Sequence, residues 1–303
     1  MSAPPTSDAE LAQARALPPP APPVVRPPVR GRTVVLGLLA LTAVAWTLVL
    51  SQAGTPVPRL AEVGERALGL LTAFAGAGQD APPAYTDPER LRLVGRLAVD
   101  TVVMSVLATG LAAVGALLTV GLAARSLAGG PGADRWDATR RLLRRLLLVC
   151  VRALHVLTRS VPEVVWALLV VFLVRPGILA GALALAVHEF GVLGRLGSDL
   201  VDDVDRGPLR SLRAAGAGKA ATLTYGVLPQ ALPQLITLLL YRWEVTVRAS
   251  VVVGFLTGAG LGYQLRLDLS FRRWTDVALV LLAYIALVWA ADATSSVLRR
   301  LAR

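Results

Sequence analysis

Apolar residues in this chain are gathered into long blocks separated by shorter polar stretches. Six blocks come close to or exceed the roughly 20 residues that a helix needs to cross about 30 Å of hydrocarbon. They cover residues 33–51, 97–124, 146–174, 178–196, 231–256 and 275–297. The alternation of apolar and polar positions that marks a membrane β-strand is absent from the sequence. The pattern therefore predicts an all-α membrane protein with six transmembrane helices.

The third block contains a break at Ser160-Val161-Pro162. Proline lacks the N–H that a helix needs, and its ring clashes with the preceding turn. We therefore expect a broken or kinked helix at this point. Arg175-Pro176-Gly177 then predicts a tight turn between the third and fourth blocks.

The N-terminal part of the chain is expected to hold a tail and an anchor. Residues 1–32 contain nine prolines and few large apolar side chains, so we predict a disordered, Pro-rich cytoplasmic tail. Residues 33–52 follow Arg30 and Arg32, and Ser51-Gln52-Ala53 is similar to a signal-peptide cleavage site. The apolar run is longer than the 7–15 residues typical of a cleaved signal, which favours a retained anchor helix.

Two further regions complete the predicted organisation. Residues 53–96 are mixed in character and are expected to form a periplasmic loop with an amphipathic helix near 59–74. Residues 97–298 form the predicted membrane core, which includes a charged, helical stretch at about 206–222 that is too polar to cross.

The charge of the chain bears on its orientation. The formal net charge is +11, although 55% of the residues are hydrophobic and the mean hydropathy is +0.62. Basic residues without interleaved aromatics argue against a nucleic-acid surface. The two tails and the loops at 125–145 and 195–228 hold 18 Lys and Arg residues, whereas the opposite loops hold 9. Because cytoplasmic loops carry the excess of Lys and Arg, we expect both termini in the cytoplasm of a multi-pass inner-membrane protein.

Motifs for catalysis or metal binding are missing from the sequence. Cys150 has no second cysteine with which to form a disulfide, and His155 and His188 are too far apart for a paired zinc motif. Gly218-Lys219 has neither the earlier glycine nor the following Ser or Thr of a phosphate-binding loop. We therefore expect no enzyme activity, no metal and no cofactor in this chain.

The most informative segment runs from Leu209 to Pro233. Its first half is typical of a short helix with small residues on one face, which could lie at the membrane surface and dock into another protein. Gly216 follows, and Leu228-Pro229 opens the next membrane block. A helix that begins at a proline is well placed to transmit motion from such a docking site.

Here the sequence resembles the permease subunits of ABC importers, whose cytoplasmic signature is Glu-Ala-Ala-x3-Gly-x9-Ile-x-Leu-Pro. Gly216 and Leu228-Pro229 match its Gly and Leu-Pro, whereas Arg210 stands at the Glu, Ser211 at the first Ala and Gly226 at the Ile. The resemblance implies a type I ABC importer permease fold and a coupling helix. The residues it implies for contact with the ATPase are Arg210, Ser211, Leu212, Arg213, Ala214, Ala215, Gly216, Ala217, Leu228 and Pro229.

Further blocks resemble the phosphonate-transport branch of these permeases. In chain order they begin at Arg159-Ser-Val-Pro-Glu163, His188-Glu-Phe-Gly191, Tyr225-Gly-Val-Leu-Pro-Gln230, Tyr241-Arg-Trp-Glu244 and Gly254-Phe-Leu-Thr-Gly258. This resemblance implies an importer of phosphonate or a related small phosphorus oxyanion; phosphate, phosphite and other small solutes stay open, as does a membrane scaffold without transport activity. It also implies a homodimer, two ABC ATPase subunits that bind ATP and Mg, and an extracytoplasmic substrate-binding protein.

Charged residues inside the predicted spans are candidates for the translocation pathway, because a charge in the membrane is costly. They are Arg159, Glu163, Arg242, Glu244 and Arg248. A guanidinium suits a phosphonate, since its fork can pair two oxygens. The alternative is neutralisation inside the protein, with Glu163 paired to Arg159 and Glu244 to Arg248 four residues on. Arg242 has no evident partner on its own helix, and His188-Glu189 is interpreted as a helix–helix hydrogen-bonding pair.

The predicted orientation can be tested with reporter fusions. Green fluorescent protein fused after Arg303 should fluoresce, and alkaline phosphatase at the same position should be inactive, because we expect the C-terminus in the cytoplasm. Fusions truncated after Arg175, in a predicted external turn, should give the reverse result. An active phosphatase at the C-terminus would contradict the six-span topology.

Overall fold

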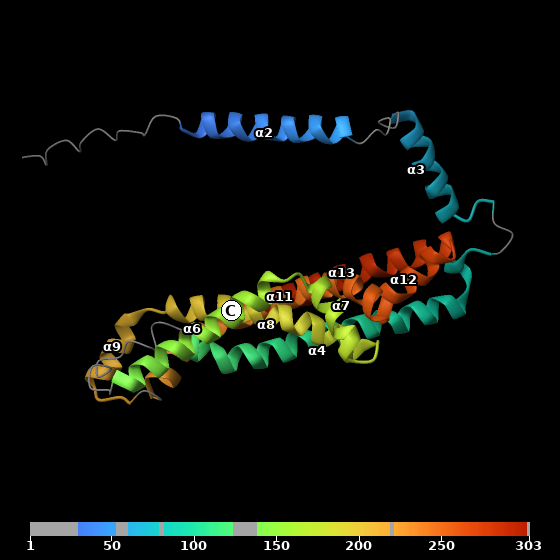
Figure 1. Ribbon diagram of the computed structural model, residues 1–303. Helices are drawn as coiled ribbons and strands as arrows, with labels where there is room; N and C mark the ends of the chain where they lie inside the picture. The colour runs from blue at the N-terminus through green and yellow to red at the C-terminus, as the bar shows by residue number, and fades with distance from the viewer. Residues whose placement is uncertain (1–29, 53–59, 79–81, 124–137, 219–220, 302–303) are drawn as a thin grey trace, which may run out of the picture. The chain divides into compact units, whose positions relative to one another are not determined.

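The computed structural model describes residues 30–52, 60–78, 82–123, 138–218 and 221–301. The chain divides into two compact units, residues 1–64 and 65–303. Every regular element in the described ranges is a helix (Figure 1), which agrees with the predicted all-α class. The tail at 1–29 lies outside the described residues.

The first unit contains α2 and the first residues of α3, and the rest of α3 belongs to the second unit. α2 spans Arg30–Gln52 and exposes its large apolar side chains along its whole length. α3 spans Leu60–Phe74 and is amphipathic, as expected. In the second unit, the ring centroids of Phe74 and Trp274 lie 6.3 Å apart. The Tyr85 hydroxyl donates to the Ala75 carbonyl at 3.0 Å. The first contact joins the end of α3 to the start of the last helix, and the second joins the residue after α3 to Tyr85.

The second unit is a helical bundle. Its elements are η1 (Ala84–Thr86), α4 (Pro88–Ala123), α6 (Ala138–Ser160), α7 (Glu163–Leu173), α8 (Ile178–Asp202), α9 (Arg206–Ala214), η3 (Thr222–Val227), α11 (Leu228–Thr257), α12 (Gly260–Ser270) and α13 (Trp274–Leu301). Over the described residues of the whole chain, five helices are long and apolar enough to cross a membrane, and there are six if α6 and α7 count as one bent span. α4 begins at Pro88, earlier than the predicted start at residue 97. α12 is an additional short helix that the apolar blocks did not predict.

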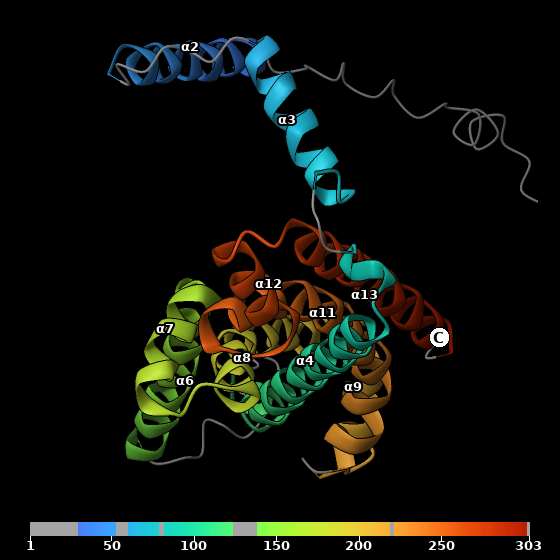
Figure 2. The same cartoon turned by 90° about the vertical axis from the view of Figure 1, so that its right-hand side faces the viewer.

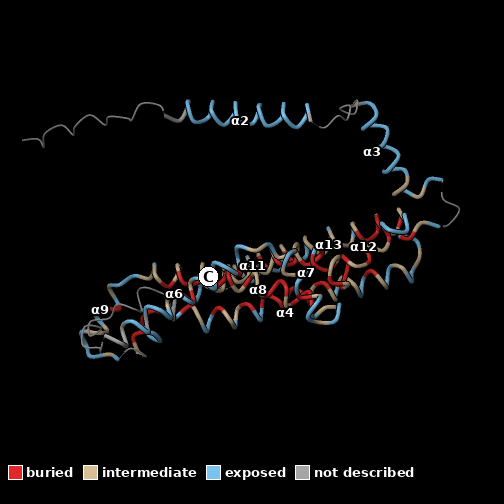
Figure 3. The backbone as a smooth tube through the Cα atoms, viewed as in Figure 1, coloured by how far each residue is buried: buried red, intermediate tan, exposed pale blue. Residues whose placement is uncertain are grey.

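α8 lies at the centre of this unit and packs against α4, α6, α7 and α11 (Figure 2). The buried residues lie along the inside of the bundle, and many of them belong to α8 (Figure 3). Glycines permit this central position. A Cβ on Gly191 would lie 2.6 Å from the His155 carbonyl oxygen and 2.7 Å from the Arg159 backbone nitrogen. Only a residue without a side chain lets the backbones of α6 and α8 approach so closely.

The predicted break at Pro162 is a bend of 97° between α6 and α7. The carbonyls near it would lack partners, but two ring N–H groups reach them. Trp166 Nε1 donates to the Thr158 carbonyl at 3.0 Å, and His188 Nδ1 lies 3.0 Å from the Val161 carbonyl. Since a carbonyl oxygen can only accept, His188 carries its proton on Nδ1. The bend is therefore satisfied by hydrogen bonds from α7 and α8.

Substitution of Gly191 should test the close approach of α6 and α8. Gly191→Ala places a methyl group against backbone atoms that cannot rotate away, and overpacking of this kind costs about 1–3 kcal/mol. We expect a lower thermal unfolding midpoint for the purified protein. The matched control is Gly110→Ala on α4, where a Cβ meets no described residue of another element within 4 Å. This variant should be neutral or slightly stabilising, because alanine is the better helix former. Equal midpoints for the two variants would contradict this packing.

Candidate functional site

A buried ion pair joins α8 and α11 in the interior of the bundle. Arg242 Nε donates to Glu189 Oε2 at 2.9 Å, and its Nη2 donates to Glu189 Oε1 at 2.5 Å. The Glu189 side chain is 4% exposed and that of Arg242 is 15% exposed. The sequence indicated no partner for Arg242 on its own helix, and the partner proves to be a residue 53 positions earlier. The predicted helix–helix contact of Glu189 is thus an ion pair with two hydrogen bonds.

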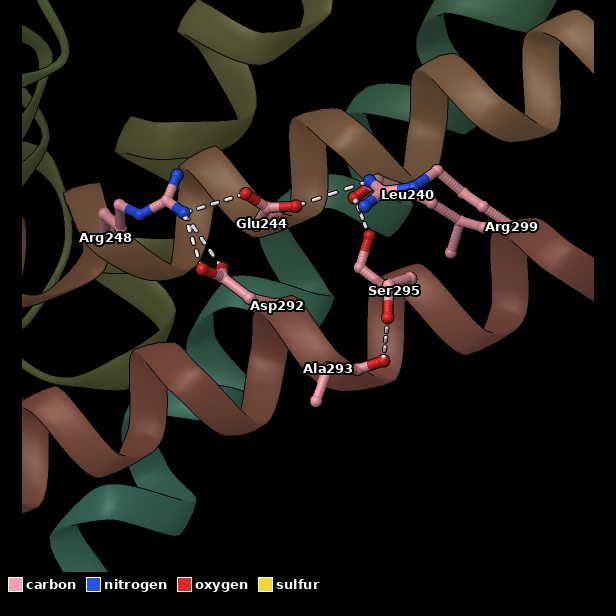
Figure 4. A network of polar contacts seen from close by, with 8 residues as sticks. Leu240, Glu244, Arg248, Asp292, Ala293, Ser295 and Arg299 are labelled. Atoms are coloured by element: carbon pink, nitrogen blue, oxygen red, sulfur yellow. Dashed lines mark hydrogen bonds and ion pairs between the residues drawn. The ribbon is translucent and has the colours of Figure 1, made fainter.

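A second polar network joins α11 to α13 (Figure 4). Glu244 Oε1 accepts from Arg248 Nη2 at 2.7 Å, which confirms the ion pair predicted from their spacing. Arg248 also donates to both oxygens of Asp292, at 2.9 and 3.1 Å, and Arg299 Nη1 donates to Glu244 Oε2 at 3.3 Å. The network contains two carboxylates and two guanidinium groups, so its net charge is zero.

One side of this network is open. The Arg248 side chain is 40% exposed and the Asp292 side chain 41% exposed, whereas Glu244 is 13% exposed. A charge pair facing lipid inside a span would be costly. The face of α11 and α13 that carries Arg248 and Asp292 therefore requires water or another protein surface beside it.

The charges near the Pro162 bend are arranged differently from the prediction. Glu163 does not pair with Arg159; its Oε2 lies 3.9 Å from His188 Nε2. The bend directs α7 away from the axis of α6, so the two residues no longer share a helix face. Arg159 is exposed and has no ion-pair partner among the residues that the structure describes.

The other polar residues on this face of α6 are held by neighbouring helices. His155 is 1% exposed; its Nε2 lies 2.9 Å from Thr119 Oγ1, and its ring meets the Phe190 ring edge-on with centroids 5.1 Å apart. Arg152 Nη2 lies 3.8 Å from Asp202 Oδ2 on α8. Of the two arginines in this row, Arg152 has an ionic partner and Arg159 has none among the described residues.

The segment that matches the permease signature begins with a short helix, α9, at one end of the bundle (Figure 1). A turn and a long helix follow it. α9 spans Arg206–Ala214 and is capped by Asp205, whose side chain accepts from the Gly207 N–H at 2.9 Å. Gly216 has φ +84°, and the N–H groups of Gly216 and Ala217 bond to the Arg213 and Leu212 carbonyls at 3.0 and 2.9 Å.

These bonds form a Schellman motif that ends the helix. The helix predicted at about 206–222 therefore stops at Ala214, because the left-handed glycine reverses the chain. The π-helical turn η3 follows at Thr222–Val227 and runs directly into α11, which has Pro229 in its first turn. Thr222–Thr257 is thus one helical element that extends from the α9 end to the charged interior.

The opposite end of the bundle carries a polar corner between α12 and α13. Asp268 is fully buried, accepts from Gln264 Nε2 at 2.9 and 3.0 Å, and pairs with Arg273 Nη2 at 3.1 Å. Burial raises the pKa of the Asp268 carboxyl above its usual value, although the Gln264 hydrogen bonds and the Arg273 charge oppose the shift. Arg90 pairs with Asp276 at 3.4 Å beside the same corner. Groups of three or more His, Cys, Asp or Glu side chains that could hold a metal are not found within the described ranges.

Comparison with known protein families gives a match over residues 136–302. The family is described as the binding-protein-dependent transport system inner membrane component. The matched region includes α9, α11 and all five candidate pathway residues.

Curated proteins similar to this chain include transport proteins of two bacteria. A phosphite transport system permease protein of Stutzerimonas stutzeri is 34% identical over 232 residues, which cover 77% of this chain and 78% of that protein. A phosphate-import permease protein of Mycolicibacterium smegmatis is 34% identical over 208 residues, which cover 68% of this chain and 36% of the longer relative.

A solved structure is similar in fold. A chain of an inward-facing structure of a methionine ABC transporter superposes with a TM-score of 0.58 at 20% identity. The superposition covers 72% of this chain and 99% of that one.

The Arg242–Glu189 pair can be tested by a double-mutant cycle. Arg242→Gln leaves Glu189 as an uncompensated buried charge, a change that costs about 3–5 kcal/mol. Adding Glu189→Gln removes that charge, so the double variant should recover most of the lost thermal stability. The control is Arg248→Gln, which should cost less because Glu244 keeps Arg299 as a partner. A double variant no more stable than Arg242→Gln would contradict a direct pair.

Proposed function

Because the chain belongs to the family of binding-protein-dependent transport system inner membrane components, we propose that it carries a small phosphorus oxyanion inward by ATP-driven alternating access. The family and the structural neighbour confirm the resemblance inferred from the sequence and the type I ABC importer permease fold. The chain is a multi-pass membrane permease subunit and not itself an enzyme.

The observation that carries the mechanism is the continuity of Thr222–Thr257. One end of this helix adjoins α9, where an ATPase subunit would dock, and its interior carries Arg242, Glu244 and Arg248. A displacement of α9 would be transmitted to these charges along one continuous helical element. ATP and Mg would be bound by the ATPase partners.

The arginines suit an anionic substrate. A guanidinium presents a planar fork of donors that matches two oxygens of a phosphorus oxyanion. In the conformation described here Arg242 directs two of its nitrogens to Glu189, and Arg248 is shared by Glu244 and Asp292. In the proposed cycle a passing anion competes with these carboxylates, and the pathway runs along the open face of α11 and α13 and past Arg159 and Glu163.

The proposed assembly has two permease subunits, which we take to be two copies of this chain. A second copy against the face that carries Arg248 and Asp292 would enclose a water-accessible path between the subunits. Two ATPases would bind at the α9 end, in the cytoplasm together with both termini. A substrate-binding protein would bind at the opposite end, beside η1 and the α12–α13 corner.

Relatives named for phosphite and phosphate support a phosphorus oxyanion as the substrate class. Phosphonate belongs to the same class of tetrahedral anions, and we propose it as the substrate. The test is uptake by vesicles that contain this chain, its ATPase and its binding protein. Methylphosphonate, phosphite or phosphate should accumulate with ATP and sulfate should not; a system that moves no phosphorus oxyanion would contradict the proposal.

Gly216 offers a test of the coupling role. Its left-handed conformation costs a residue with a side chain about 1–2 kcal/mol. Apart from its chain neighbours, no described residue has an atom within 4 Å of the place that a Cβ would take, so the described surroundings leave room for a side chain. Gly216→Val should therefore displace α9 and lower substrate-stimulated ATP hydrolysis. Gly216→Asn is the matched control and should retain more activity, because asparagine adopts this conformation more readily. Equal activity in both variants and the parent would count against coupling through α9.

A further inference from the structure

One face of α9 is strongly basic. Arg206, Arg210 and Arg213 are spaced at i, i+4 and i+7, so at about 100° per residue they lie within a sector of roughly 60°. Arg206 and Arg210 are exposed, and Arg213 is partly so. The buried Leu209, 7% exposed, lies about 40° outside this sector and fixes the helix to the bundle.

The three guanidinium groups have no ion-pair partner among the residues that the structure describes. The nearby Asp205 is engaged as the helix cap. Arg206 also stands in the first turn of α9, where the helix dipole disfavours a positive charge. The stability of α9 by itself does not account for this arrangement. The described residues supply no counter-charge to these arginines, so we look for it in a binding partner.

The arginines border a hollow of about 320 Å³. Its other lining residues are apolar: Val201, Val204, Leu209 and Val227. The hollow therefore has a rim of positive charge and an apolar floor, and it has room for one or two side chains. A carboxylate next to an apolar side chain would complement both features.

We propose that the ATPase subunit meets α9 with an acidic surface whose carboxylates pair with Arg206, Arg210 and Arg213. This inference rests on the proposed function, since it specifies the partner of the coupling helix. Arg210 occupies the position at which the family signature has glutamate, so the charge at this point of the contact is reversed. An ATPase matched to the family's glutamate would present the wrong sign to this chain.

An anionic lipid headgroup is the competing source of negative charge. The apolar hollow beside the arginines favours a protein partner, because a headgroup would leave that floor uncovered by any side chain. α9 also continues through the Gly216 turn into η3 and α11, which is the geometry expected of a contact that transmits motion.

The test uses the assembled permease and its ATPase in detergent. ATPase retained on the tagged permease is measured between about 50 and 500 mM NaCl, a range over which exposed charges become strongly screened, for the parent chain and for Arg206→Glu, Arg210→Glu and Arg213→Glu. We expect retention of the parent to fall with salt, and each reversal to weaken binding by about tenfold or more, because like charges across an interface are strongly unfavourable. Arg300→Glu, an exposed arginine on α13, should bind as the parent does.

Charge reversal on the partner completes the design. Aspartates and glutamates on the permease-facing surface of the ATPase are changed singly to arginine, and at least one should restore binding to Arg210→Glu. Neutral Arg→Gln variants, checked for a monodisperse elution profile, replace any reversal variant that fails to assemble. Neutral variants should weaken binding less than the reversals and flatten its salt dependence.

The possible failures are distinguishable. If the ATPase binds but is insensitive to salt and to all three arginines, the acidic contact is refuted and the permease role stands. If the arginine variants lose binding to phosphatidylglycerol vesicles but not to the ATPase, the counter-charge is lipid and the inference is wrong. If the parent chain binds no ATPase under any salt condition, the proposed function itself fails.

Discussion

The requirement that a charge inside the bundle be matched by a neighbouring helix determines how α8, α11 and α13 are placed. Glu189 can be buried because Arg242 supplies two hydrogen bonds, and Glu244 because it accepts from both Arg248 and Arg299. Each pair restricts the rotation of one helix against the next, since a modest turn of α11 would separate the partners. The apolar contacts around these pairs are less directional, so by themselves they would let one helix slide further along the next. The polar pairs therefore set the register of the interior, and the open Arg248–Asp292 side marks where the bundle is incomplete without water or a partner.

Close backbone contact supports this register. Gly191 and Gly194 bring α8 against α6, where His155 occupies the space that a side chain on Gly194 would need. Gly262 similarly brings α12 against α11, since a Cβ there would overlap the Val251 carbonyl. Within this tight frame the 97° bend at Pro162 is supplied with donors from Trp166 and His188. The same histidine extends toward Glu163, so the bend and one of the candidate pathway carboxylates are structurally linked.

Local features of the sequence predicted much of this arrangement, but they could not predict pairs between residues that are far apart in the sequence. The apolar blocks, the Pro162 break and the Glu244–Arg248 pair depend on neighbouring positions, and the structure contains all three. The Arg242–Glu189 pair could not be deduced, because 53 residues separate the partners and nothing in the sequence specifies how α8 faces α11. Arg159 and Glu163 are close in sequence, yet the bend parts them. α9 ends at Ala214 because Gly216 terminates it; the glycine was visible in the sequence, but its left-handed conformation was not.

The bend between α6 and α7 has a consequence for insertion into the membrane. α7 has 11 residues, about 16 Å of helix, which is roughly half the hydrocarbon thickness. α6 carries Arg152, His155 and Arg159 within its apolar stretch, and it cannot cross at low cost on its own. Neither segment is a sufficient stop or start signal for the translocation machinery. We therefore expect stable insertion of α6 and α7 to require α8, which supplies the donor at the bend, the glycine surface for α6 and the carboxylate partner of Arg152. The three helices would then enter the bilayer as one unit rather than one at a time.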